Sequence, residues 1–415
     1  MTATTTTQPS STEPPAEPTP TGRALPQPGE RAGAETVRAA RAGLEGVVAA
    51  ATRLSEVDGE AGELLIAGFP VEELAPRASF EETVHLLWHD RLPRAEELAE
   101  LRAELARHRA LPAAVLDLLR AATADRVGPM DALRMAVGAF DLGLSPADRD
   151  DPEGLALRLV AAVPAAVAAH HRLARGLEPV PPDPALGHAA DYLRQLTGET
   201  PPADRVRGLE TYLVTVADHG FNASTFAARV VVSTGSDLVS AVTAAIGALK
   251  GPLHGGAPGP ALETVFEIGT AERAEQVLAA KLDRGERLMG FGHRVYRVRD
   301  PRADVLAAAA ERLFTAGSGD RQLYDLARAV EATALRILRE RKPGRRLDTN
   351  VEFYTALLLH GLDLPVELFT PTFAVGRVAG WTAHAREQAA EGRLIRPLSE
   401  YSGARGRRWV RVEER

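Results

Sequence analysis

The stretch AEELAELRAELARHRAL, residues 95–111, places leucines three and four positions apart and fills the intervening positions with Glu, Arg and Ala. Apolar residues at this spacing form one face of an α-helix, and these residue types favour helix. The same pattern occurs in residues 80–92, 131–144 and 157–177, and Pro or Gly residues separate the segments. The chain contains no regular series of short strands. The sequence therefore predicts an almost entirely α-helical fold.

One region near the N-terminus departs from this pattern. Residues 43–74 hold two short apolar runs around Asp58-Gly59, a dipeptide typical of tight turns, so they predict a small β-hairpin. Further along the chain, the segment 205–250 predicts two helices with an interruption at 218–222. Gly-rich or Pro-rich breaks follow within 249–302 and at 342–350, and helical periodicity resumes after each break.

The overall composition excludes several classes of function. The chain has 415 residues, a formal net charge of −7 and 45% hydrophobic residues, which is an ordinary globular balance. It has no cysteine, which excludes disulfides, Cys-ligated zinc, iron–sulfur clusters and a thiol nucleophile. The acidic charge and the 5% aromatic content give no basis for predicting nucleic-acid binding. Nearly all of the 49 basic residues are Arg, so anions should be bound by forked guanidinium groups.

Two segments bear on the location of the protein. The most apolar run, residues 159–169, contains Pro164 and is shorter than the roughly 20 residues that a membrane-spanning helix needs. Residues 1–32 are rich in Pro, Thr and Ser and contain no apolar stretch. We predict that residues 1–32 form a disordered tail, that no segment spans a membrane, and that the protein is cytoplasmic.

The side chains best suited to catalysis lie at the breaks between helices. His254 stands in GPLHGGAP, His293 stands in GFGHRVYRVRDPR, and Glu352 follows the breaker KPGRRLDTN. Loops between rigid helices often carry catalytic groups, and glycine allows a ligand to approach the backbone closely. Each residue also has an ordinary structural explanation when taken alone. A glutamate at a helix N-terminus, for example, is favoured by the helix dipole.

Other motifs point to no site. His85 and His89 are four residues apart, but no HExxH arrangement accompanies them, so we predict no metal site. The chain lacks GxGxxG, GxxxxGK[ST] and GxSxG. These absences argue against a dinucleotide-binding fold, a P-loop and a serine hydrolase.

Taken together, the sequence segments at and after these breaks resemble those of the citrate synthase family. The segments GPLHGGAP, GFGHRVYRVRDPRA, NVEFYTALLL and VGRVAGWTAHAREQ occur in the family's order, and the resemblance runs from about residue 43 to 401. It implies an all-α, two-domain fold with a small N-terminal β-hairpin. By this resemblance, the large domain covers 33–255 and 363–415, and the small domain covers 256–362.

The resemblance also implies an activity. The family condenses an acyl-CoA with a 2-oxo acid, usually oxaloacetate, and then hydrolyses the thioester. By resemblance, His254 hydrogen-bonds the thioester oxygen, Glu352 abstracts a proton from the acyl carbon, and His293 polarises the ketone. The oxaloacetate-binding residues are then His219, Arg302, Arg377 and Arg396, and Arg297 lies near CoA. The resemblance also implies a homodimer with shared active sites, because Arg396 matches the arginine that reaches the partner's site, and it implies no cofactor and no metal.

General chemistry agrees with these roles. A dianionic 2-oxo acid calls for several guanidinium groups, because Arg binds carboxylates with two hydrogen bonds. A thioester α-carbon is a weak acid, so a carboxylate can deprotonate it only when a donor such as His254 stabilises the developing oxygen charge. Glu352 stands at a helix start near arginines, and we predict that both features lower its pKa.

The sequence departs from the family at a few positions and leaves three functions open. The family usually has Asp where Glu352 stands, and Pro258, Val216 and Gly220 replace Asn, His and Glu. The first hypothesis is citrate synthase with acetyl-CoA. The second is 2-methylcitrate synthase with propionyl-CoA, which sequence does not separate because one methylene changes binding by only about 1–3 kcal/mol. The third is a catalytically silent regulatory paralog that binds CoA and dicarboxylate, suggested by Glu352.

Overall fold

The computed structural model describes residues 42–44, 46–255, 258–293 and 295–415. The chain separates into two units, one of residues 1–49 with 399–415 and the other of residues 50–398. In the first unit, the described residues form two short 3₁₀ helices, Ala42–Leu44 and Val412–Glu414, and residues 399–415 are exposed. The predicted tail of residues 1–32 lies outside the described residues. All elements that carry the predicted site belong to the second unit.

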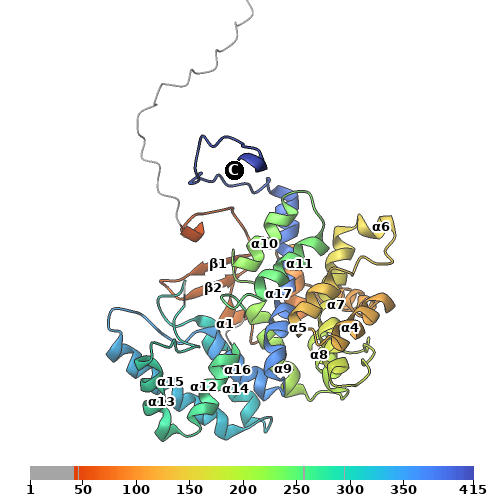
Figure 1. Cartoon of the computed structure of the whole chain (residues 1–415). Helices are drawn as coiled ribbons and strands as arrows, with labels where there is room; N and C mark the ends of the chain where they lie inside the picture. Colours follow the sequence, from red (N-terminus) through yellow and green to blue (C-terminus); the bar gives the residue numbers. More distant parts are fainter. Residues whose placement is uncertain (1–41, 45, 256–257, 294) are drawn as a thin grey trace, which may run out of the picture. The chain divides into compact units, whose positions relative to one another are not determined.

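The predicted all-α fold is confirmed (Figure 1). The helices of the second unit are α1 Val71–Leu74, α2 Phe80–His89, α3 Ala95–His108, α4 Ala113–Ala124, α5 Pro129–Val137, α6 Pro146–Arg149, α7 Pro152–Ala174, α8 His188–Thr197, α9 Ala203–Val216, α10 Ala223–Val232, α11 Leu238–Leu249, α12 Pro258–Ile268, α13 Ala274–Asp283, α14 Pro301–Thr315, α15 Arg321–Arg341, α16 Val351–Gly361 and α17 Phe369–Glu391. Two 3₁₀ helices, Ala271–Arg273 and Val366–Leu368, precede α13 and α17.

The predicted hairpin is present and carries a third strand that the sequence did not predict. Antiparallel strands β1 (Ser55–Asp58) and β2 (Glu63–Ile66) pair around a turn that starts at Asp58. The Asp58 carboxylate accepts the backbone N–H groups of residues 60 and 61, both at 2.9 Å, as is typical of an Asx turn. Strand β3 (Phe69–Pro70) then pairs with β2. Two residues are too few to show the alternation by which a strand is predicted.

Helix α17 forms the centre of the second unit. It packs against α7, α9, α10 and α11, which surround it in Figure 1, and its side chains are buried along most of its length. Helix α7 is the one helix in the described part of the chain that is long and apolar enough to cross a membrane, but 72% of its most apolar window is buried inside the protein. Burial explains a helix that is apolar on every face. The cytoplasmic location stays a prediction.

The prediction of two helices within 205–250 is wrong, because this segment forms three. The interruption predicted at 218–222 separates α9 from α10, and a second break separates α10 from α11. Gly235 adopts a φ of +83° at the second break, and the Asp237 carboxylate accepts the N–H of Ser240 at 2.7 Å. A left-handed glycine ends α10 and an aspartate cap begins α11.

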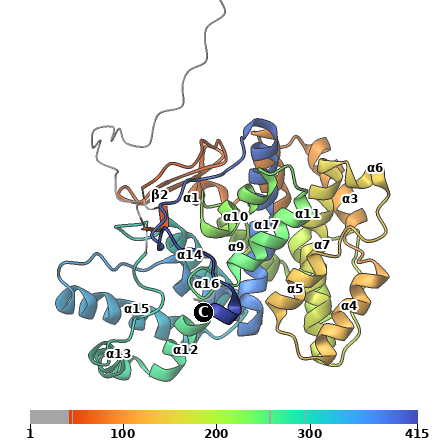
Figure 2. The same cartoon turned by 45° about the horizontal axis from the view of Figure 1, so that its top comes forward.

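Helices α12 to α16 pack mainly against one another and contact α9 through α14 and α16 (Figure 2). Two of these helices carry a predicted site residue in their first turn. Arg302 is the second residue of α14, and Glu352 is the second residue of α16. The division into domains at 256 and 362 stays a prediction.

Candidate active site

An aspartate fixes the first arginine of the site at the start of α14. Asp300 caps this helix by accepting the N–H of Arg302 at 3.0 Å. The same carboxylate accepts hydrogen bonds from Nε (3.0 Å) and Nη2 (2.8 Å) of the Arg302 side chain, and both residues are buried. Burial opposes the charge of Arg302, but Asp300 raises its pKa overall. The guanidinium is therefore charged and held in one orientation.

His293 is held as a neutral imidazole. Its Nδ1 accepts the backbone N–H groups of Val295 (3.0 Å) and Tyr296 (3.1 Å). Burial, followed by the charge of Arg302, lowers the pKa of His293 to about 4. The single ring proton therefore sits on Nε2. Nε2 lies 3.5 Å from Nη2 of Arg302, so two donors face the same small space.

His219 completes this side of the site from the loop between α9 and α10. Its Nε2 lies 3.2 Å from the hydroxyl of Tyr296, and its ring centre lies 5.9 Å from that of His293. Burial, then the charges of Arg302 and Arg377, lowers the pKa of His219 well below its usual value. The ring is therefore neutral at physiological pH.

Arg377 is the second arginine of the site and projects from α17. Its side chain is 1% exposed, its Nε donates to the carbonyl of Val216 at 2.6 Å, and its guanidinium lies 4.8 Å from the ring centre of Phe373. Among the described residues, no carboxylate lies within ion-pair distance of it. Burial lowers its pKa to about 10, so the guanidinium stays charged. A buried cation without a carboxylate partner is suited to an anionic ligand.

His254 lies in the loop after α11 and is linked to two helices. Its Nε2 lies 2.8 Å from the hydroxyl of Ser224 and 3.4 Å from the backbone N–H of the same residue. The indole N–H of Trp381 donates to that hydroxyl at 3.0 Å. Burial lowers the pKa of His254 to about 4, so its ring is neutral. A backbone N–H can only donate, so Nε2 accepts and the ring proton sits on Nδ1.

Glu352 corrects one prediction. Its backbone N–H is capped by the side chain of Asn350 at 3.0 Å, so the Glu352 carboxylate is not needed for capping. We predicted a lowered pKa, but burial raises it to about 7, and the charges of Arg302 and Arg377 offset only part of this effect. The prediction was wrong because a helix start and nearby arginines can be inferred from sequence, whereas desolvation depends on the packed structure.

Two predicted residues lie apart from this cluster within the chain. Arg297 is exposed, and its Nε lies 4.0 Å from Glu60 at the turn between β1 and β2. Arg396 is exposed beyond the end of α17. The other predicted residues are connected by the contacts and electrostatic effects described above, and the charge of Arg377 adds to burial in lowering the pKa of His254. No role was predicted for Tyr296 or Asp300, although both stand within GFGHRVYRVRDPR, or for Ser224, five residues after His219.

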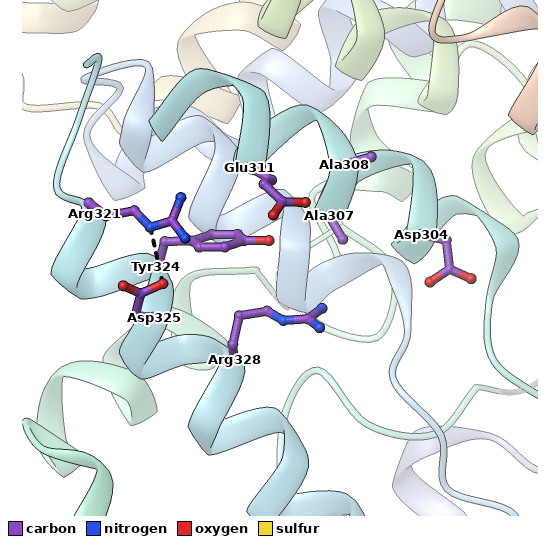
Figure 3. Close-up of a pocket in the computed structure, with 8 residues that line it drawn as sticks. All are labelled: Asp304, Ala307, Ala308, Glu311, Arg321, Tyr324, Asp325 and Arg328. Carbon is purple, nitrogen blue, oxygen red and sulfur yellow. Dashed lines mark hydrogen bonds and ion pairs between the residues drawn. The ribbon is translucent and has the colours of Figure 1, made fainter. Parts of the chain in front are cut away.

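A separate hollow between α14 and α15 contains none of the predicted residues. It has a volume of about 430 Å³, and its lining is shown in Figure 3. Arg321 and Asp325 form an ion pair there at 3.1 Å, and Asp304 pairs with Arg299 outside the lining. Arg328 pairs with Glu331, also outside the lining, at 3.6 Å, so most charged groups at this hollow have an ion-pair partner, unlike Arg377.

The fold and the cluster define a class of enzyme. Two buried guanidinium groups can bind a dicarboxylate, two neutral histidines present N–H donors that can stabilise developing negative charge on oxygen, and one carboxylate with a pKa near neutrality can move a proton. Such a constellation suits proton abstraction next to a carbonyl followed by carbon–carbon bond formation.

Comparison with known proteins identifies the family. The family described as "Citrate synthase, C-terminal domain" matches residues 43–398. Citrate synthase 2 of Bacillus subtilis is 44% identical, with 90% of this chain and 98% of that protein aligned. A 2-methylcitrate synthase of Mycobacterium tuberculosis is 42% identical over 87% of this chain and 90% of its own length.

A solved structure agrees with this result. Citrate synthase of Thermoplasma acidophilum, in a ternary complex with carboxymethyl coenzyme A and oxaloacetate, superposes with a TM-score of 0.81 at 30% identity and covers 90% of this chain and 98% of its own. The chain belongs to the citrate synthase family. It is an acyltransferase of the citrate synthase type.

Proposed function

We propose that this protein condenses acetyl-CoA with oxaloacetate and water to give citrate and free CoA. The proposal rests on the presence in one cluster of two buried arginines, Arg302 and Arg377, and one carboxylate, Glu352, whose pKa lies near neutrality. The arginines provide the charge that a dicarboxylate needs, and the carboxylate provides the base. The ternary complex of the Thermoplasma relative with oxaloacetate and a CoA analogue supports the same pair of substrates.

The first step of the proposed reaction removes a proton from the acyl carbon. The Glu352 carboxylate takes the proton, and the electron pair of the C–H bond moves toward the thioester oxygen. His254 stabilises that oxygen through its Nδ1–H, while its Nε2 is fixed by Ser224. A neutral donor suits this role, because an enol or enolate oxygen gains charge only as the proton leaves.

The second step forms the carbon–carbon bond. The acyl carbon attacks the ketone carbon of oxaloacetate, whose carbonyl oxygen accepts hydrogen bonds from Nε2–H of His293 and from Arg302. The oxygen is protonated as the new alcohol forms, and the proton that Glu352 removed in the first step balances this one. Water finally cleaves the thioester: its hydroxyl bonds to the carbonyl carbon and its proton reaches the CoA sulfur. The steps involve no net redox change, and we propose that they need no cofactor.

We further propose a homodimer in which Arg396 binds oxaloacetate in the partner's site. Arg396 is exposed beyond the end of α17, where it pairs with no carboxylate among the described residues, and this supports a role outside its own subunit. Arg297 is proposed to contact CoA, because its exposed side chain leaves it accessible to a phosphate.

A second candidate function is 2-methylcitrate synthesis from propionyl-CoA, favoured by the 42% identity to a protein of that name. The test for both is thiol release from acetyl-CoA and from propionyl-CoA, each measured with oxaloacetate and, as a control for simple hydrolysis, without it. Oxaloacetate-dependent release from acetyl-CoA with the higher kcat/KM is the expected result. A higher kcat/KM for propionyl-CoA favours the second candidate, and release from neither contradicts both.

A further inference from the structure

A chain of buried polar side chains runs behind His219 and is not used by the reaction. His384 of α17 is fully buried, with 0% of its surface exposed. Its Nε2 lies 3.2 Å from Oδ2 of Asp218, and its Nδ1 lies 2.9 Å from Nη1 of Arg229 on α10. The imidazole of α17 therefore lies between a carboxylate in the loop before α10 and a guanidinium group on α10.

The identity of these partners fixes the protonation state of His384. A guanidinium group can only donate, so Nδ1 of His384 must be an acceptor. The ring proton then sits on Nε2, where it donates to the Asp218 carboxylate. Burial by itself raises the pKa of Asp218, but His384 and Arg377 outweigh burial and hold that pKa below its usual value. Asp218 is therefore ionised and accepts the hydrogen bond.

The far end of the chain is anchored as well. Arg229 is 2% exposed and pairs with Glu387 at 2.5 Å, and its Nε donates to the side-chain oxygen of Gln388 at 3.0 Å. Both partners stand on α17, as His384 does. The guanidinium that fixes Nδ1 is thus itself held in place by two further contacts to the same helix.

Asp218 and Gly220 stand on either side of His219, and one hydroxyl links both of them. The hydroxyl of Ser55 on β1 donates to Oδ2 of Asp218 at 2.5 Å and accepts the N–H of Gly220 at 2.7 Å. The loop also lies very close to α17, so a Cβ added at Gly380 would clash with the carbonyl oxygen of Ala217. These contacts therefore restrict the movement of the backbone that carries His219.

We propose that His384 is a positioning residue, which acts as a neutral Nε2–H donor through Asp218 to orient His219 toward the oxaloacetate pocket. The inference rests on the proposed function, because it gives His219 a substrate to bind. His384 itself touches no substrate. Its loss leaves Arg229 paired with Glu387, whereas Asp218 keeps only Ser55 as a hydrogen-bond donor and the loop loosens.

The test compares substitutions that keep or remove the donor. His384→Phe keeps a planar ring and removes both hydrogen bonds, so the KM for oxaloacetate should rise on the order of tenfold while the KM for acetyl-CoA stays within about twofold. His384→Gln retains an N–H donor and should recover most of the affinity for oxaloacetate. Ser55→Ala removes the other donor to Asp218 at a partly exposed site, and it should raise the same KM even when His384→Phe fails to fold.

The matched control is Thr382→Val. Thr382 is buried two residues away on α17 and accepts the indole N–H of Trp88 at 3.2 Å, without contact to Asp218. This change should lower thermal stability and leave the KM for oxaloacetate unchanged. An unchanged oxaloacetate KM in both His384→Phe and Ser55→Ala, or equal losses for both substrates, overturns the positioning role alone. A wild-type protein without oxaloacetate-dependent thiol release overturns the proposed function and this inference together.

Discussion

Asp300 and Arg302 are joined by two side-chain hydrogen bonds, of 3.0 and 2.8 Å, although only one residue separates them in the chain. The same carboxylate caps α14 and accepts the N–H of Val351 at 3.3 Å, at the start of α16. One buried aspartate therefore sets the orientation of the Arg302 guanidinium and ties together the two helix starts that carry Arg302 and Glu352.

The first prediction concerns this aspartate. Asp300→Asn keeps an oxygen that can cap α14 but loses the paired interaction with Arg302. The KM for oxaloacetate should rise at least about tenfold, because a charge-assisted bidentate contact that orients the arginine is lost. Steady-state kinetics with each substrate varied will check this, and an equal rise in the KM for acetyl-CoA contradicts it. The exposed pair between Arg321 and Asp325 on α15 offers a control, since Asp325→Asn should leave both KM values unchanged.

The second prediction concerns His293, whose Nε2–H faces the same space as Arg302. His293→Ala removes one of the donors to the ketone oxygen, and kcat should fall on the order of 100-fold or more. His360→Ala is the control, because that histidine lies on α16, packs against Phe266 and has no contact to the cluster. Turnover near the wild-type value in His293→Ala would remove this residue from the mechanism.

The third prediction concerns sharing of the site between subunits. Arg396→Ala should weaken oxaloacetate binding but preserve the dimer, because the residue serves a ligand rather than the interface core. Mixed dimers of Arg396→Ala with Glu352→Gln should regain activity, because one of their two sites combines intact Glu352 and Arg396. Activity is measured after the two variants are unfolded and refolded together. Absence of any recovery in verified heterodimers shows that Arg396 serves its own subunit.

The fourth prediction concerns a buried acid remote from the cluster. Glu210 of α9 accepts the N–H of Phe80 at 2.5 Å, and burial, followed by the neighbouring Glu81, raises its pKa. A raised pKa in the folded state means that Glu210 contributes stability at low pH and that this contribution is lost as pH rises through its folded pKa. Glu210→Gln stays neutral and keeps the acceptor for Phe80.

Glu210→Gln should therefore gain stability relative to wild type between about pH 5 and about pH 9, by on the order of 2 kcal/mol. Chemical denaturation at both pH values measures the difference. Glu100→Gln removes an exposed carboxylate on α3 and should give the same difference at both. A pH-independent effect of Glu210→Gln would contradict the raised pKa.

The sequence was informative about the site where the motifs coincide with breaks between helices. His254, His293 and Glu352 all stand at such breaks, because helix ends bring side chains and free backbone groups to one place. Contacts between residues far apart in the chain, such as the one beside His219, were harder to predict. Asp218 and His384 are 166 residues apart, and no local pattern predicts that pair.

Burial was the other quantity that local patterns could not supply. The helix start and the arginines around Glu352 suggested a low pKa, and packing of α9, α14 and α17 around the site reversed the direction of the pKa shift.

The second break within 205–250 was also not predicted from the sequence. Asp237 and Gly235 have the expected chemistry of helix ends, but the apolar periodicity on both sides conceals the break.

The final prediction concerns Glu352, on which the proposed reaction most depends. A base must be ionised, and the pKa of Glu352 is about 7 because burial disfavours the charge. The rate should therefore rise with pH through about 7 and level off above it. The raised pKa also means that the ionised carboxylate destabilises the folded protein as pH rises through 7. Glu352→Gln should accordingly cut kcat on the order of 100-fold or more while stability at about pH 8 stays equal or increases.

A capping role for Glu352 predicts the reverse, with stability lower by about 1 kcal/mol and unchanged chemistry. The side chain of Asn350 already caps this helix, at 3.0 Å from the N–H of Glu352. Glu352→Asp is the sharper comparison, because it keeps the charge and shortens the side chain by one methylene. If the site is adapted to glutamate, the aspartate variant should be slower, since a displacement of about 1 Å can cost on the order of 100-fold in rate. A faster aspartate variant, or wild-type protein that binds oxaloacetate by calorimetry but releases no thiol, would favour the silent regulatory paralog over the enzyme.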